Sequence, residues 1–156
     1  MRRSSYRSDV MQAMFYWLMV VLRLAFGALF VFSGLNDLLH FWQPPAPVTP
    51  QTQALMQGLV GSGFILPVLG VVYLIGGLTV LFNRFAALGL VILAAPTVVI
   101  FSYHATEHHL LGPGLAVLIV HLLLAWQRRD AYVDLFQANP ARRRAAQSGR
   151  ISAVST

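Results

Sequence analysis

The chain has 156 residues, of which 57% are hydrophobic and only 10% are charged. Soluble domains carry about 25% charged residues, so this composition argues against an ordinary soluble protein and favours a membrane protein. The net charge of +6 comes mostly from arginines near the two ends, and the absence of cysteine excludes disulfides and thiolate chemistry within the chain. No motif typical of a nucleic-acid-binding module, a phosphate loop or a catalytic triad occurs.

Four apolar runs are long enough to cross a bilayer, since a helix rises about 1.5 Å per residue and the hydrocarbon core is about 30 Å thick. Backbone groups in lipid must find partners within their own segment, so these runs predict helices. The predicted spans are residues 14–35, 59–82, 85–103 and 110–126. The predicted fold class is therefore an all-α transmembrane four-helix bundle, which occupies residues 14–136.

The first predicted span follows a basic N-terminal segment, residues 1–13. This start resembles a signal peptide, but the apolar run after it is too long, is interrupted by Arg23 and lacks a clean cleavage site. We therefore interpret residues 14–35 as a retained span. A guanidinium near the middle of a membrane helix costs about 3 kcal/mol or more unless the protein or a ligand receives it. Arg23 is thus a functional-site hypothesis in its own right.

The distribution of arginine predicts how the spans are oriented. Arginines precede the first predicted span, lie between the second and third at Arg84, and follow the fourth at Arg128 and Arg129. The two other loops contain none, so the positive-inside rule places both termini of this multi-pass protein in the cytoplasm. The membrane that we expect is the bacterial inner membrane. In the longer outer loop, residues 51–57 are a candidate for a short interfacial helix.

The segment after the last span, residues 137–156, is polar and basic, and its composition predicts a disordered cytoplasmic tail. Its three consecutive arginines, residues 142–144, have two interpretations. They contact anionic membrane lipid, or they act only as a topology signal on the tail.

Glycines recur every seven residues on the first two predicted spans, at positions 27 and 34 and at positions 63, 70 and 77. Each set lies along one helix face, and small residues let membrane helices approach closely. We therefore predict a seam between these two spans. Arg23 lies one turn before Gly27, so it is expected to point into the bundle.

Three polar residues are predicted to converge at similar depths in the inner half of the membrane: Arg23, Tyr73 and His121. Carbonyls freed by Pro96 are further candidate acceptors for Arg23. One interpretation is a site for a polar headgroup, such as a quinone or a lipid carbonyl, because Arg and His donate and Tyr both donates and accepts. The other interpretation is a hydrogen-bonded knot that holds the helices together.

A second set of polar residues is predicted at the outer face of the membrane. Imidazoles and carboxylates are common metal ligands, and histidine also titrates near neutral pH. The cluster is therefore a candidate for metal binding, or for a proton-handling or quinone-contacting role of His104, although interfacial histidines are common and the pattern names no metal. Its members are Asp37, His40, His104, Glu107 and His108, with His109 beside them.

Several short motifs follow one another in order between residues 20 and 136. They are residues 34–41 (GLNDLLHF), 63–67 (GFILP), 76–78 (GGL), 84–88 (RFAAL), 93–96 (LAAP), His104 and 128–136 (RRDAYVDLF). In this order and spacing the chain resembles the DoxX-like family of four-helix integral membrane proteins. Many members of that family carry glutamate where this chain has Tyr73 and asparagine near Ile100, so an activity that depends on an Arg–Glu pair is not expected to transfer.

The resemblance implies a membrane subunit without a redox cofactor of its own, because some DoxX-like proteins are described as small subunits of thiosulfate:quinone oxidoreductase. The expected ligand is a quinone, and the expected partners are membrane lipid, a redox protein and further copies of the chain, but no nucleic acid. Whether the chain itself is an enzyme stays open. Two alternatives remain: a non-catalytic scaffold or anchor, and a small transporter.

Overall fold

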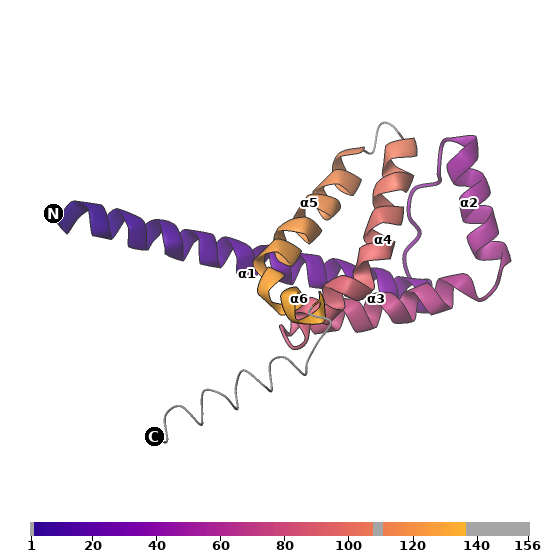
Figure 1. The fold of residues 1–156 in the computed structure, drawn as a ribbon. Helices are drawn as coiled ribbons and strands as arrows, with labels where there is room; N and C mark the ends of the chain where they lie inside the picture. The colour runs from indigo at the N-terminus through magenta and orange to yellow at the C-terminus, as the bar shows by residue number, and fades with distance from the viewer. Residues whose placement is uncertain (1, 108–110, 137–156) are drawn as a thin grey trace, which may run out of the picture.

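The computed structural model describes residues 2–107 and 111–136, with side-chain surroundings described for residues 9–107 and 111–132. Within these ranges every regular element is a helix (Figure 1). The helices are α1 (Arg2–Leu39), α2 (Pro50–Gly61), α3 (Ile65–Leu81), α4 (Ala86–Thr106), α5 (Leu111–Gln127) and α6 (Arg129–Phe136). The protein is thus all-α, as predicted. The predicted tail, residues 137–156, lies outside the described residues.

Among the described residues, two helices are long and apolar enough to cross a membrane: the part of α1 from Asp9 to Leu39, and α4. A third span is available if α2 and α3, which meet at a bend of 92°, are counted together, while α5 is apolar but has only 17 residues. These helices indicate a membrane protein. The first helix begins at Arg2, well before the predicted span, so its N-terminal part extends away from the other helices (Figure 1).

The predicted span 59–82 is not one helix, because the chain breaks between Gly61 and Ile65. Ser62 serves both sides of this break: its hydroxyl donates to the Leu59 carbonyl at 2.7 Å and accepts from the Ile65 amide at 3.2 Å. Gly63 has a positive φ of 72°, a conformation that favours glycine. The short helix expected in the outer loop is confirmed as α2 and runs on to this break.

The predicted glycine seam between α1 and α3 is confirmed for Gly27, Gly34, Gly70 and Gly77. It is wrong for Gly63, which lies in the break before α3 with no neighbour within 4 Å. A Cβ atom added to Gly34 would lie 2.7 Å from the Gly70 carbonyl oxygen, and one added to Gly77 would lie 3.0 Å from the Gly27 carbonyl oxygen. These contacts are to backbone atoms, which cannot move aside as a flexible side chain does. The two helices therefore pack so closely that only glycine fits at these positions.

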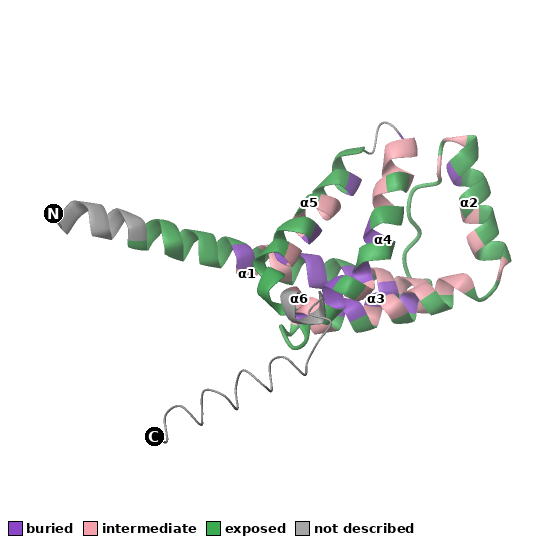
Figure 2. Cartoon of the chain, in the orientation of Figure 1, coloured by how far each residue is buried: buried purple, intermediate pink, exposed green. Residues whose placement is uncertain are grey.

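The core lies where α1, α3, α4 and α5 meet (Figure 2). Its buried side chains are Phe26, Phe30, Tyr73, Val80, Leu90, Leu93 and Leu124. By contrast, the large apolar side chains of α1 from Met11 to Leu18 are all exposed. Lipid or another protein must cover that part of α1, because water does not solvate such a surface favourably.

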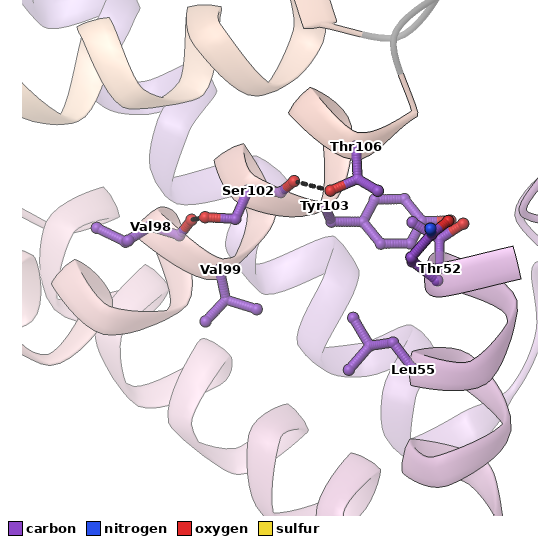
Figure 3. A pocket seen from close by; sticks show the side chains of 8 residues that line it. Thr52, Leu55, Val98, Val99, Ser102, Tyr103 and Thr106 are labelled. Atoms are coloured by element: carbon purple, nitrogen blue, oxygen red, sulfur yellow. Dashed lines mark hydrogen bonds between the residues drawn. The ribbon is translucent and has the colours of Figure 1, made fainter. Parts of the chain in front are cut away.

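Helix α2 stands partly apart from α4 and leaves a cleft of about 280 Å³ between them (Figure 3). Its lining residues are Gln51, Thr52, Leu55, Val98, Val99, Ser102, Tyr103 and Thr106. This cleft lies beside the end of α4 that leads to Glu107.

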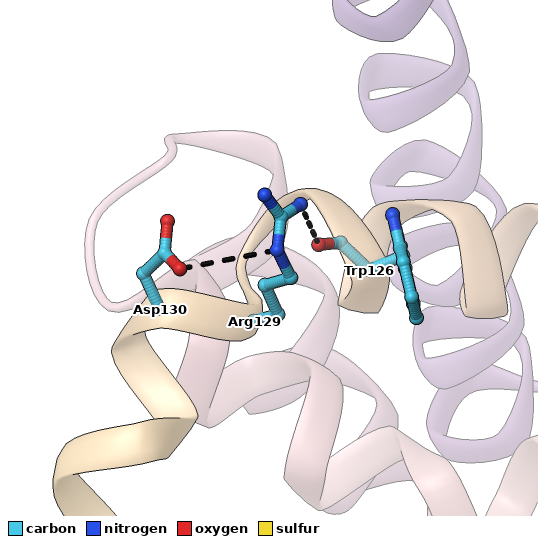
Figure 4. Close-up of polar contacts among 3 residues, drawn as sticks. All are labelled: Trp126, Arg129 and Asp130. Atoms are coloured by element: carbon cyan, nitrogen blue, oxygen red, sulfur yellow. Dashed lines mark hydrogen bonds and ion pairs between the residues drawn. The ribbon is translucent and has the colours of Figure 1, made fainter.

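The opposite end of α4 begins at a tight turn after α3, in which Asn83 and Phe85 have positive φ angles of 59° and 58°. The C-terminal segment holds this turn: Arg128 donates to the Asn83 side-chain oxygen, and the Tyr132 hydroxyl donates to the Ala87 carbonyl at 3.2 Å. Arg129, next to Arg128, makes its contacts at the surface. Arg129 lies 5.6 Å from the centre of the Trp126 ring and 3.9 Å from the Asp130 carboxylate (Figure 4).

Candidate functional site

The packing of α1 against α3 fixes the depth of Arg23. Gly27 lies against Leu81, and Gly34 lies against Gly70 and Leu74, so the two helices run antiparallel. One turn before Gly27, Arg23 is therefore level with the turn that follows Leu81. Tyr73 is level with Gly34, eleven residues or about 16 Å further along α1.

The prediction that Arg23 and Tyr73 share one depth is therefore wrong. A first span that begins at residue 14 would put Arg23 nine residues from the inner end of the span, level with Tyr73. Helix α1 instead begins at Arg2, and the contacts with α3 set its level. Arg23 consequently lies near the end of the bundle, and Tyr73 lies well inside it.

Two phenylalanine rings connect Tyr73 with His121. The ring centres are 5.3 Å apart from Tyr73 to Phe30, 4.9 Å from Phe30 to Phe26, and 5.5 Å from Phe26 to His121. The sequence interpretation missed Phe26 and Phe30, although their spacing of four places them on one face of α1. Tyr73 and His121 are thus parts of one aromatic row, separated by the two phenylalanines.

His121 has a hydrogen-bond partner that the sequence did not reveal. Its Nδ1 atom lies 2.9 Å from the hydroxyl of Thr97, and both residues are buried. Thr97 belongs to α4, directly after Pro96, and His121 belongs to α5. This bond satisfies a buried polar group on each helix, as the hydrogen-bonded-knot interpretation requires for His121.

Arg23 differs from His121 because part of its guanidinium has no partner. Its side chain is half-buried, and within the described ranges its Nε is the one buried side-chain nitrogen or oxygen that lacks a hydrogen bond. The bond expected from a carbonyl near Pro96 is not made by this atom. A buried N–H without an acceptor costs about 1–3 kcal/mol, and more when the group is charged.

At the other end of the molecule Glu107 is 1% exposed and gathers donors from the loop before α2. Its carboxylate accepts from the amides of Val48 and Thr49, at 3.0 Å each, from the Thr49 hydroxyl at 3.2 Å, and from the Thr52 hydroxyl. These donors, the Thr49 amide first and the Thr52 hydroxyl next, lower the pKa of Glu107 to about 2, although its burial acts in the opposite direction. We call this group the Glu107 clasp.

The clasp ties the loop to α4 at the position where α2 begins. Thr49 is the N-cap of α2, and its hydroxyl also accepts from the Thr52 amide at 3.4 Å. Threonine is a favoured N-cap, and Pro50 follows at the first helical position, which suits proline. Glu107 was predicted as one member of a polar cluster; its partners come instead from hydroxyl and backbone groups.

The remaining described members of the predicted outer cluster fall into two places: Asp37 and His40 near the end of α1, and His104 against α5. His104 donates through Nδ1 to the Ile100 carbonyl at 2.8 Å, and its ring packs on Gly114 of α5. Asp37 packs beside Gly70 in the α1–α3 seam, and His40 is exposed at the end of α1, where its φ is 52°. His108 and His109 lie outside the described residues. Among the residues that the structure describes, no three His, Asp or Glu side chains lie close enough together to hold a metal ion.

Comparisons with protein-family models, curated proteins and solved structures found no match to this chain.

Proposed function

We propose that the chain is a DoxX-like, multi-pass protein of the bacterial inner membrane that acts as a subunit of a quinone-linked redox system. In this proposal α1, α3, α4 and α5 form a four-helix membrane bundle with both termini in the cytoplasm. The subunit carries no redox cofactor of its own, and it receives the headgroup of a quinone or a lipid at Arg23.

The buried, unpartnered Nε of Arg23 is the observation that carries this proposal. A guanidinium has five N–H donors and no acceptor, so its natural complement is a carbonyl or anionic oxygen. Phe26, three residues further along α1, is 3% exposed and packs edge-on against His121. A quinone or lipid headgroup offers the carbonyl oxygens that suit the Arg23 guanidinium.

The distribution of aromatic and basic residues supports the proposed membrane placement. From Trp17 to Leu39, α1 rises about 33 Å, close to the thickness of a hydrocarbon core. Exposed Trp17 lies near one end of this interval and exposed Trp42 lies just beyond the other, as expected for aromatic residues at the two interfaces. Arg23, level with the turn that contains Arg84, then lies about 9 Å inside the cytoplasmic end of this interval. A ligand headgroup reaches it without crossing the bilayer centre.

A non-catalytic scaffold is the second candidate, and the N-terminal part of α1 favours it. The large apolar side chains from Met11 to Leu18 are 52–67% exposed, which gives a partner protein a long apolar surface. This function requires no ligand at Arg23.

Mass spectrometry of the protein purified in mild detergent tests the proposal. We expect bound quinone or lipid in the wild-type protein and at least about a tenfold loss in Arg23→Leu, because about 1.4 kcal/mol of binding corresponds to tenfold in affinity. Arg84→Leu is the matched control, since Arg84 is exposed in the neighbouring turn. It should retain the ligand.

Two results would overturn the proposal. Equal ligand retention by both variants would show that Arg23 does not bind the headgroup. Failure of Arg23→Leu alone to insert or fold would show that the arginine stabilises the bundle. A ligand-free protein that captures a partner only while the N-terminal part of α1 is present would favour the scaffold.

A further inference from the structure

The cleft between α2 and α4 (Figure 3) lies at the Glu107 end of α4, and Arg23 is not among the residues that line it. Helix α2 is fixed at both of its ends: the Glu107 clasp holds its N-terminus, and its C-terminus bends by 92° into α3. Between these two attachments α2 does not close onto α4. The two attachments of α2 therefore keep the cleft open, and no single side-chain rotamer determines it.

The lining of the cleft changes from polar to apolar along α4. Thr106 and Tyr103 lie toward the Glu107 clasp, together with Gln51 and Thr52 from the first turn of α2. Further from the clasp the lining consists of Leu55, Val98 and Val99. From Thr106 to Val98 the helix rises about 12 Å. An amphipathic molecule has the same gradient, with a polar head and an apolar chain.

The size and position of the cleft limit the molecule that fits it. At about 280 Å³ the cleft is slightly smaller than the pockets of roughly 300–1,000 Å³ that hold drug-sized ligands. It suits one alkyl chain better than the two chains of a phospholipid. Val98 and Val99 are 55% and 57% exposed, and they belong to a helix that is long and apolar enough to span a membrane. A chain can therefore enter from the surrounding lipid.

The charges around the cleft limit which ligand headgroups it can accept. Among the described residues, no charged side chain lines the cleft, and the Glu107 carboxylate beside it binds Thr52 and stays ionised because its pKa is lowered to about 2. An anionic head placed beside Thr52 would be repelled. The Thr106 and Ser102 hydroxyls donate to carbonyls of their own helix, so their lone pairs can accept from a ligand hydroxyl. The Tyr103 hydroxyl can donate as well as accept.

We propose that this cleft binds an uncharged single-chain amphipath, with its chain along Val98 and Val99 and its hydroxyl or carbonyl head at Tyr103. The gradient of the lining selects an amphipath, the volume selects one chain, and the Glu107 carboxylate selects against an anionic head.

Native mass spectrometry of the full chain in detergent tests this site with two matched probes. They are 1-monooleoylglycerol and 1-oleoylglycerol 3-phosphate, which share the chain and the glycerol but differ in charge. We expect one saturable copy of the uncharged probe per protein and at least about tenfold weaker retention of the anionic probe. Val99→Trp fills the cleft and should abolish the saturable copy. Val71→Trp, on an exposed position of α3 outside the cleft, should retain it.

Tyr103→Phe separates headgroup recognition from the burial of the chain. This variant leaves the cleft apolar and open, and we expect it to weaken retention of the uncharged probe several-fold. Arg23→Leu should not alter retention of this probe, which distinguishes the cleft from the proposed quinone site. The proposal is overturned if Val99→Trp retains the saturable copy, if Tyr103→Phe binds as wild type does, or if the anionic probe binds as well as the uncharged one.

Discussion

Glu107 and Arg23 are both charged residues of a largely apolar chain, but their surroundings differ. The carboxylate of Glu107 is almost wholly buried and accepts hydrogen bonds from the amides and hydroxyls that begin α2. The guanidinium of Arg23 is half-buried and leaves its Nε without an acceptor among the described residues. A buried charge whose hydrogen bonds all come from the protein stabilises the fold. A charge that keeps a donor without an acceptor is a candidate for binding a ligand or a partner.

Replacing Glu107 by glutamine should have the largest effect of any single change at these two sites. Glutamine keeps the shape but loses the charge and turns an NH₂ group toward donors, so the clasp should open. We expect hydrogen exchange at the amides of Val48 and Thr49 to accelerate by at least about tenfold. Ser102→Ala, which removes a hydroxyl bonded only to its own helix, is the control. If exchange at the two amides is unchanged, the clasp does not hold the loop.

Acid should open the same clasp in the wild-type protein. Folding lowers the pKa of Glu107 from its ordinary value of 4.5 to about 2. The ionised carboxylate therefore stabilises the folded state fully above about pH 4.5, and this contribution is lost as the pH falls through about 2. Thermal unfolding in detergent between pH 7 and pH 2 should show a decline that is smaller in Glu107→Gln. Parallel declines in both proteins would exclude Glu107 as the cause.

Thr52→Val tests a single donor of the clasp. The substitution keeps the shape of the side chain and removes the buried hydroxyl that donates to Glu107. A hydrogen bond to a charged group contributes about 1.5–3 kcal/mol, so the free energy of unfolding should fall by roughly this amount. Thr106→Val is the matched control, because its hydroxyl donates only within α4, and it should change stability by no more than about 0.5 kcal/mol. Equal effects of the two substitutions would contradict the clasp.

Arg23→Leu should have the smallest effect on stability. It removes a guanidinium whose Nε makes no hydrogen bond in the described structure, so we expect thermal unfolding in detergent within about 1 kcal/mol of wild type. Its effect should instead appear in ligand retention. A large loss of stability in Arg23→Leu, with Arg84→Leu as stable as wild type, would show that Arg23 stabilises the fold, as Glu107 does.

The sequence predicted the helices and the α1–α3 seam well, for local reasons. Hydropathy marks apolar helices, and glycines spaced by seven mark a face at which two helices approach. The break near Ser62 was missed because the long apolar runs on both sides outweighed the turn signal of Gly61, Ser62 and Gly63. The partners of Glu107 were missed because Thr49 and Thr52 lie more than fifty residues away along the chain.

The sequence by itself determined that this is an all-α protein with apolar helices, and that Gly27, Gly34, Gly70 and Gly77 lie on contacting faces. Both properties follow from composition and helical period, which are local. Only the tertiary structure decided that Arg23 and Tyr73 lie at different depths, that Thr97 satisfies His121 and that α2 is tied to Glu107. Depth and hydrogen-bond partners depend on the register between helices, and register is fixed by the packing of side chains from distant parts of the chain.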